Sequence, residues 1–210
     1  MMKRHIAIIV VVCLSCVQVL AETITFKDGI HIHWSKEDKI VSPGQIWELN
    51  IMPSEIDSDD FTPVYLSKPG QDKTHLLFKF IRDGIIFWHG DALFVEDMQS
   101  SSTYSIMLFN PLSKYPHQSQ GLALDDVVRA EVRRKVKDEE IYHYYPHFVS
   151  WTGNKLVVAV DTGTVKYGTG QPGMSPCLGY EIDAQSLEIK ASLTKKELLE
   201  KYNLDCEEGW

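Results

Sequence analysis

Hydrophobic and polar positions alternate along most of the chain from residue 22 onward, and turn residues interrupt this alternation at short intervals. An alternation with period two is typical of strands whose two faces have different surroundings. The pattern predicts strands over residues 23–26, 30–34, 45–52, 74–81, 85–88, 92–96, 104–109, 141–151, 156–160, 178–182 and 187–190. In two of them the predicted inward residues are Trp47, Leu49 and Ile51, and Leu76, Phe78 and Phe80. The chain is therefore expected to be rich in β-structure.

Two Asp-Gly pairs are expected to reverse the chain between strands, because glycine adopts the positive φ of tight turns without a steric penalty. The pair at 28–29 would join the first two strands as a hairpin. The pair at 83–84 would turn the chain into the strand over 85–88.

One stretch follows the period of a helix instead. Apolar residues recur at helical spacing over 123–137, at Leu124, Val127, Val128, Val132 and Val136. The opposite face carries Arg129, Arg133, Arg134 and Lys137, and acidic residues follow directly at 138–140. This basic face is either a binding surface for an acidic partner or a solvated helix face whose charges are balanced nearby.

A motif of the form Trp-x-Gly-Asx-x-Leu-x-Val occurs twice, at 88–95 and at 151–158. Each copy predicts a strand, a tight turn at its Gly-Asx pair and a second strand, and a third strand follows a polar loop. The motif resembles the inner hairpin of a β-propeller blade, in which an aromatic residue precedes the turn. Two copies cannot close a propeller, which needs about four blades or more.

These elements together predict the fold class. We expect a mainly β (α+β) protein, with an antiparallel sheet sandwich or curled sheet, one inserted amphipathic helix and a short C-terminal helix. The C-terminal helix is predicted from a capping-box pattern at Thr194 and Glu197, and Asn203 can end it in a left-handed conformation.

The first 21 residues have the pattern of a secretory signal peptide. Lys3 and Arg4 precede an apolar run over 6–17 that is too short to span a bilayer, and Ala21 is a suitable small residue for cleavage. The expected mature chain is a single β-rich domain over 22–210 that is periplasmic or secreted and has no stable membrane insertion. Lipid attachment at Cys16 is the alternative processing route.

Cys177 and Cys206 remain after removal of the leader. An even pair in an exported chain predicts a disulfide, which would attach the C-terminal helix to the sheet. Two buried free thiols are the alternative.

The net charge of the mature chain indicates which kinds of partner are expected. Removal of Lys3 and Arg4 with the leader changes the formal net charge from −8 to −10. Nucleic acid is therefore not expected as a partner, because phosphate contacts need a basic surface. No phosphate-binding or dinucleotide-binding glycine motif is recognised, so no cofactor is expected.

One segment suggests catalysis. The apolar strand 156–160 leads into Asp161-Thr162-Gly163-Thr164, which resembles the active-site loop of aspartic peptidases. The resemblance implies that Asp161 is a catalytic candidate and that two chains pair to bring two carboxylates together. The same residues are also favourable for a turn at the end of a hairpin, and that alternative stays open.

Histidines give a second catalytic candidate. His31 and His33 fall on one face of a predicted strand, a spacing that metal sites use. A metal-assisted hydrolase would need three or four ligands to converge, whereas exposed strand histidines are the simpler interpretation.

A loop over 167–176 that is rich in glycine and proline gives the binding candidates. A loop attached to a rigid sheet can present a binding surface at low entropic cost, and exposed tyrosines are favoured interface residues. The candidate residues are Tyr142, Tyr144, Tyr167, Gln171, Met174 and Ser175. Alternatively the loop is a connector and the tyrosines are half-buried against the helix.

The favoured hypothesis is an exported, non-enzymatic binding protein. Its acidic charge suits an inhibitor or immunity-type protein that neutralises a basic extracytoplasmic enzyme or toxin. The alternatives are an aspartic peptidase-like or metal-assisted hydrolase, and an envelope protein that carries a ligand or has a structural role.

Overall fold

The structure is a computed structural model. It describes residues 22–33, 36–52, 61–72, 75–80, 82–100, 103–114, 118–136, 139–166, 168–173 and 176–206. Of these residues, 54% are in strands and 19% in helices, and the strands form three antiparallel sheets. The mainly β (α+β) class predicted from the sequence is confirmed. The proposed leader, Trp34, Lys137, Tyr167, Met174 and Ser175 lie outside the described residues.

All named strands pair in antiparallel fashion. The five-stranded sheet has the order β1 (Thr23–Thr25), β10 (Glu139–Thr152), β11 (Lys155–Lys166), β12 (Cys177–Asp183) and β13 (Ile189–Leu193). The second sheet has the order β2 (Ile30–His33), β7 (Asp83–His89), β8 (Ala92–Met98) and β9 (Tyr104–Phe109). The third has the order β3 (Asp38–Val41), β4 (Glu48–Ile51), β5 (Thr62–Ser67) and β6 (His75–Phe80).

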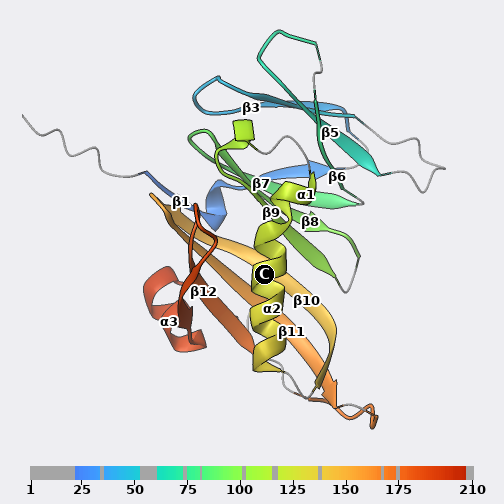
Figure 1. The fold of residues 1–210 in the computed structure, drawn as a ribbon, viewed down its shortest axis with the longest axis vertical. Coiled ribbons are helices and arrows are strands. Elements are labelled where there is room, and N and C mark those ends of the chain that lie inside the picture. Colours follow the sequence, from blue (N-terminus) through green and yellow to red (C-terminus); the bar gives the residue numbers. More distant parts are fainter. Residues whose placement is uncertain are drawn as a thin grey trace, which may run out of the picture.

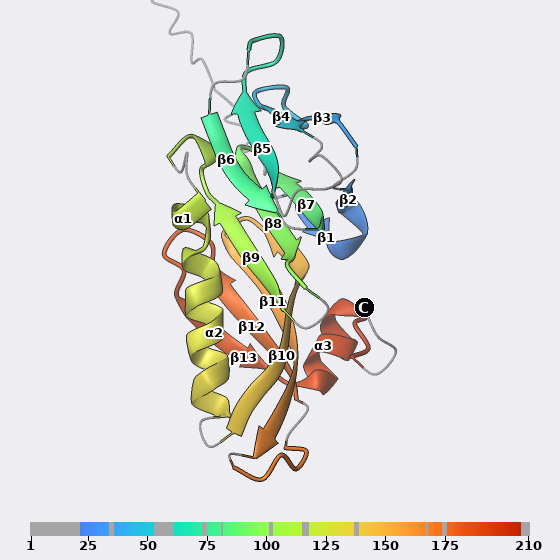
Figure 2. The ribbon, with the colours of Figure 1, turned by 90° about the vertical axis from the view of Figure 1, so that its right-hand side faces the viewer.

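Three α-helices and two short 3-10 turns complete the described structure. They are η1 (Phe26–Asp28), η2 (Leu112–Lys114), α1 (Gln118–Gly121), α2 (Ala123–Lys135) and α3 (Lys195–Tyr202). Helix α2 crosses the five-stranded sheet on one side, and α3 lies on the other side (Figures 1 and 2). None of the helices in the described part of the chain has the length and apolar character needed to cross a membrane.

The sheet containing β7, β8 and β9 is the middle layer, and both of its faces are buried. Phe87 and Phe94 pack into the core shared with α2 and the five-stranded sheet. Their neighbours Trp88 and Leu93 point the other way, into the core shared with the third sheet. Burial on both faces explains why the sequence of these strands is almost continuously apolar.

Helix α2 is held by the apolar stripe that its sequence predicts. Leu124, Val128 and Val132 are all fully buried against the five-stranded sheet and the middle layer. On the opposite side of the same sheet, Val157 packs with Leu198 of α3 in a smaller core. Adjacent residues of β11 therefore face different helices, as strand geometry requires.

The repeated Trp-Gly-Asx-Leu motif forms two meanders of three strands each, β7–β8–β9 and β10–β11–β12. Trp88 pairs with Leu93 in one copy, and Trp151 pairs with Leu156 in the other. The glycine between them has φ +58° in the first turn and +56° in the second, so both predicted turns are confirmed. The two meanders contribute to the same apolar core rather than to the blades of a propeller.

The predicted hairpin around the Asp-Gly pair at 28–29 is wrong. Strand β1 pairs with β10, whereas β2 pairs with β7, so the two strands enter different sheets. Gly29 has φ −70°, which any residue can adopt. The Asp28 carboxylate accepts a hydrogen bond from the Thr25 N–H at 2.7 Å and so stabilises the start of η1 instead of a tight turn.

Two local predictions in the middle of the chain are also wrong. Asp83 and Gly84 do not form a turn but are the first residues of β7. A Cβ at Gly84 would lie 2.8 Å from the carbonyl oxygen of Glu96, so glycine is required there for strand approach. In β6, a register shift turns Leu77 inward, and Leu76 is left 39% exposed.

The C-terminal predictions are confirmed. Cys177 and Cys206 form a disulfide with a Cα–Cα distance of 6.2 Å. Thr194 and Glu197 form the expected capping box, and Asn203 ends α3 with φ +54°. The disulfide is compatible with an oxidising extracytoplasmic location.

The packing of α3 is expected to weaken at alkaline pH because of Tyr202. Burial, together with the hydrogen bond that its hydroxyl donates to Glu181 at 3.1 Å, raises the pKa of Tyr202 to about 12. The unfolded chain has a tyrosine pKa of about 10, so this stabilisation is complete below pH 10 and is lost as the pH rises toward 12. Urea unfolding at about pH 9 and about pH 11 should show a larger loss for the wild type than for Tyr202→Phe. Equal losses in the two proteins would contradict this prediction.

Candidate functional site

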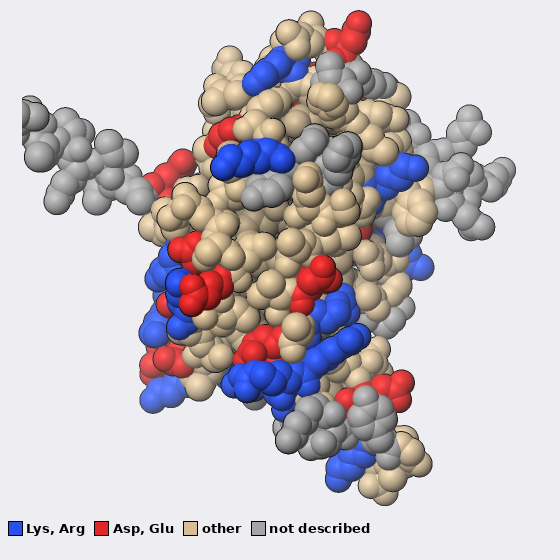
Figure 3. All heavy atoms as spheres, in the orientation of Figure 1, with Lys and Arg blue, Asp and Glu red and all other residues tan. Residues whose placement is uncertain are grey.

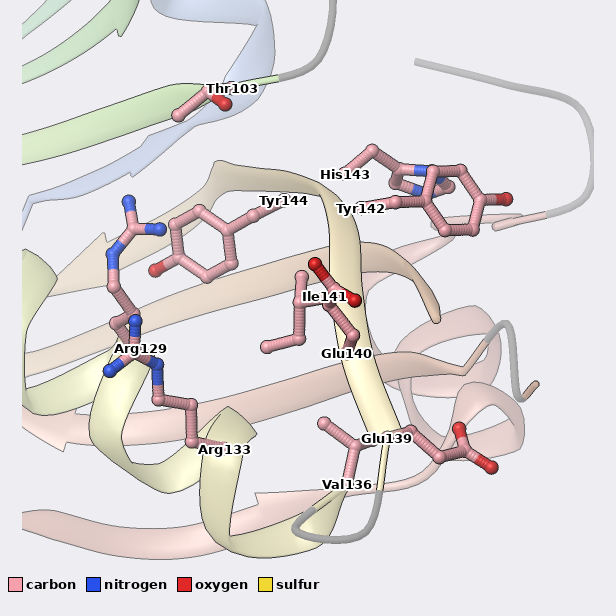
Figure 4. Close-up of a pocket in the computed structure, with 10 residues that line it drawn as sticks. All are labelled: Thr103, Arg129, Arg133, Val136, Glu139, Glu140, Ile141, Tyr142, His143 and Tyr144. Carbon is pink, nitrogen blue, oxygen red and sulfur yellow. The ribbon is translucent and has the colours of Figure 1, made fainter. Parts of the chain in front are cut away.

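An open cleft of about 520 Å³ lies between α2 and the first half of β10. Six consecutive residues of β10 line it, together with two arginines of α2 (Figure 4). The lining residues are Thr103, Arg129, Arg133, Val136, Glu139, Glu140, Ile141, Tyr142, His143 and Tyr144. The side chains of these six residues point to both sides of the strand, so a cleft that touches all six must run along the edge of the strand.

The edge of β10 is open in this region because its neighbours pair elsewhere. Strand β1 pairs with β10 only at residues 150–152, and Thr103 forms an isolated parallel bridge with Tyr144. No described strand pairs with residues 140–143 on the side opposite β11. Main-chain groups on such an edge are available to another chain.

Arg129 forms part of the α2 wall and is held by four contacts, one of which is a hydrogen bond from Nη2 to the Tyr104 carbonyl oxygen at 3.4 Å. Its Nε and Nη2 donate to Asp125 Oδ2 at 3.1 and 3.0 Å. Its guanidinium carbon lies 3.9 Å from the centre of the Tyr144 ring. A planar guanidinium suits both the bidentate pair and the stacking.

Asp125 is the buried group that organises this wall. It also accepts hydrogen bonds from the Ile106 N–H at 3.3 Å and from the Tyr144 hydroxyl at 3.2 Å. Burial raises the pKa of Asp125, and the neighbouring Arg129 only partly offsets that effect. Burial next to the Asp125 charge also raises the pKa of the Tyr144 hydroxyl, so this phenol stays protonated at neutral pH.

Arg133 lies one helical turn after Arg129, and like charges at this spacing destabilise an isolated helix. In the described part of the chain it makes no ion pair or hydrogen bond, whereas the adjacent Arg134 donates to Glu131 at 2.6 and 2.7 Å. Lys and Arg atoms gather over the lower half of α2 in Figure 3. On the α2 wall, Arg129 is therefore paired with Asp125, whereas Arg133 has no acidic partner among the described residues; Glu139 and Glu140 line the strand side of the same cleft.

Two of the three tyrosines predicted as binding residues, Tyr142 and Tyr144, lie on different sides of β10. Tyr142 is 56% exposed and Tyr144 is buried. The register shift between Ile141 and His143 leaves Tyr142 without a partner on β11, and the tyrosine ring lies over Gly163. Figure 4 shows Ile141 and Tyr144 directed toward the arginines, with Tyr142 and His143 on the other side of the strand.

The predicted binding loop folds back on the end of β11. Gln171 accepts a hydrogen bond from the Lys166 N–H at 3.0 Å, and Pro172 bridges Val165. A Cβ at Gly173 would lie 2.5 Å from the Glu139 carboxylate, so this end of the loop touches the first residue of the cleft strand. The described part of the loop and the tyrosine strand are thus neighbours.

Asp161 is not in a loop or a turn. It lies inside β11, where it pairs with Tyr145 of β10 and with Cys177 of β12. The neighbouring side chain that the structure places beside its carboxylate is His143, with Nε2 at 3.8 Å from Oδ2. Both conformations expected for the segment 161–164 are therefore wrong, because the whole segment pairs with β10 as part of β11, and Asp161 also pairs with β12.

His31 and His33 are both exposed on β2. His33 Nε2 lies 3.7 Å from Asp83 Oδ1. Within the described residues, no three His, Cys, Asp or Glu side chains come together in an arrangement that could hold a metal ion.

A second polar pair was not recognised in the sequence. Glu96 on β8 and His147 on β10 are both buried, with Glu96 Oε2 3.4 Å from His147 Nδ1. Glu96 Oε1 accepts the Phe148 N–H at 2.6 Å, beside the register shift in β10. The available signal was a pair of acidic residues, Glu96 and Asp97, inside a strand that is otherwise apolar on both faces.

Comparison with protein-family models found no match for this chain. Comparisons with curated proteins and with solved structures found no match either. The function is therefore inferred from the geometry of the cleft.

Proposed function

We propose that this protein is a binding protein that takes an extended, acidic segment of a partner protein along the open edge of β10. The observation that carries the proposal is the cleft that follows six consecutive residues of this edge. In strand addition, main-chain hydrogen bonds provide affinity and adjacent side-chain pockets provide specificity. The exposed edge over 140–143 offers main-chain hydrogen bonds, and the cleft offers a pocket for side chains.

The charge of the cleft indicates which segment fits. Arg133 has no partner among the described residues and projects from α2, and Arg129 lies beside it. A carboxylate on the α2 side would form a charge-assisted hydrogen bond with Arg133. Glu140 lies on the strand side, so the acidic group of the partner is expected to face α2 rather than β10.

Export and inhibition are narrower parts of the same proposal. The signal-like leader and the disulfide support a periplasmic or secreted protein. A partner that is a basic extracytoplasmic enzyme or toxin would add long-range attraction to the acidic protein, and that attraction would weaken with salt. The α2 side of the cleft, at Arg133, would then bind an acidic segment within this partner.

Charge reversal at Arg133 tests the proposal. Arrayed peptides of about six residues, rich in β-branched residues and containing one Asp or Glu, would be titrated against the oxidised protein by fluorescence polarisation. We expect Arg133→Glu to weaken the binding of these peptides about tenfold, because an attractive charge becomes repulsive. The same peptides with Asn or Gln should bind the wild type more weakly.

Arg134→Glu is the matched control, because it makes the same charge change on the next residue, outside the cleft. It should leave peptide affinity unchanged. Hydrogen exchange at the amides of residues 140–143 should slow when peptide is bound. Equal losses in the two variants, or binding without protection of these amides, would contradict the proposal.

A further inference from the structure

A second pocket, of about 450 Å³, lies between the end of α3 and residues of β7, β8 and β10. Its size falls within the range of about 300–1,000 Å³ that is usual for small-molecule sites. It is lined by Phe26, Ile85, Phe87, Glu96, His147, Phe148, Leu199, Asn203, Leu204 and Asp205. Most of these residues are apolar, and three of them are aromatic.

Aromatic rings form one wall of this pocket. Phe87 and Phe148 are stacked with their ring centres 4.1 Å apart, and both are buried. Phe26 and Leu199 are 39% and 46% exposed, so they lie where the pocket opens to solvent. Exposed apolar residues at the rim of an apolar pocket are typical of ligand sites.

The charged groups of the lining are acidic. Glu96 is only 3% exposed and has the Phe148 N–H and the His147 ring as hydrogen-bonding neighbours. A carboxylate has about four acceptor positions, so Glu96 can accept further hydrogen bonds. Asp205 adds a second carboxylate, and the described lining contains no lysine or arginine.

We propose that this pocket binds a small organic cation, with an ammonium group carried on an apolar body. The ammonium group would donate to Glu96, and the body would contact Phe87, Phe148 and Leu199. The apolar ring wall suits the body of this ligand, and the carboxylate suits its ammonium group. The proposal is independent of peptide binding, because the two sites share no residue.

The test uses a matched pair of probes, 2-phenylethylamine and the neutral 2-phenylethanol. Each is titrated into the full oxidised protein, and backbone amide resonances are followed by NMR. We expect saturable shifts at Phe148, whose N–H bonds Glu96, and at Asn203 in the pocket wall. The amine should bind about tenfold more tightly than the alcohol, since only the amine pairs with the carboxylate.

Glu96→Gln keeps an acceptor for the Phe148 N–H but removes the charge. This variant should lose the preference for the amine, whereas Glu188→Gln, an exposed control with the same charge change, should keep it. Equal affinities of the two probes for the wild type, or an unchanged preference in Glu96→Gln, would overturn the proposal.

A third variant tests the site if Glu96→Gln does not fold. Leu199→Trp fills the mouth at an exposed position of α3. It should weaken binding of both probes at least about tenfold by blocking access. Unchanged binding in Leu199→Trp, with the shifts located away from Phe148, would show that the probes bind elsewhere and would refute the site.

Discussion

Asp125→Ala is expected to lower the free energy of unfolding by about 3–5 kcal/mol, because removing one partner of a buried ion pair leaves the other without compensation. The Tyr144 hydroxyl and the Ile106 N–H would lose the Asp125 acceptor, and Arg129 would keep only its hydrogen bond to the Tyr104 carbonyl oxygen. The Arg129 side chain is 28% exposed and keeps some hydration, so we expect the lower half of this range. Urea unfolding at neutral pH measures the loss.

Two comparisons make this result specific. Asp126→Ala changes an exposed aspartate on the next residue and should have a small effect. Asp125→Asn keeps an acceptor and removes the buried charge, whose cost is shown by the raised pKa of Asp125. We expect it to be much milder than Asp125→Ala. A loss in Asp125→Ala no larger than that in Asp126→Ala would show that the network does not stabilise α2.

The second large effect is expected from the disulfide. Cys177→Ala combined with Cys206→Ala should cost about 3–4 kcal/mol, because the bridge closes a loop with a sequence separation of 29 and so restricts the unfolded chain. The residues around it form only a small core under α3. Chemical denaturation of the double variant and of the oxidised wild type gives the difference directly.

Reduction of the wild type provides the control, because it breaks the bond without changing the sequence. The reduced wild type and the double variant should unfold at similar denaturant concentrations. Leu198→Ala in the oxidised protein should cost about 2–5 kcal/mol through packing alone. An unchanged stability in the double variant would mean that the packing of α3 is sufficient without the bridge.

Short-range signals in the sequence were sufficient for much of this fold. The capping box at Thr194, the apolar stripe of α2 and the two Gly-Asx turns depend on residues within a few positions of one another. Each of these features is stabilised by neighbouring residues, so distant parts of the chain do not change the local structure that forms. The disulfide was also predictable, because only two cysteines remain after the leader.

Pairing over long distances was not predictable. Asp28 and Gly29 fit a hairpin turn locally, yet β1 and β2 enter different sheets because β10 and β7 offer them partners. The segment at Asp161 fits a loop or a turn, but it is extended because it pairs with β10 along its length and with β12 at Asp161. Tertiary pairing overrides local preference in both cases.

The candidate site was predicted only in part for the same reason. Tyr142 and the basic face of α2 are recognisable in the sequence, but no local pattern indicates that they line one cleft with the edge of β10. The alternation rule treated Tyr142 and Tyr144 alike, whereas the register shift at Tyr142 separates them. Glu96 is recognisable as a candidate site residue only in the folded chain, where His147 and Phe148 lie beside it.

The position of the middle sheet also constrains the order in which the chain can fold. One face of β7, β8 and β9 is covered mainly by segments that precede them in the chain, and the other mainly by segments that follow. During synthesis the first face can be buried early. Phe87, Phe94 and Ile106 on the second face stay exposed until α2, β10 and β11 have been made and have folded onto them. Such pairing of distant segments slows folding and exposes apolar surface in partly folded chains. An intermediate with this face open would be the state most prone to aggregation.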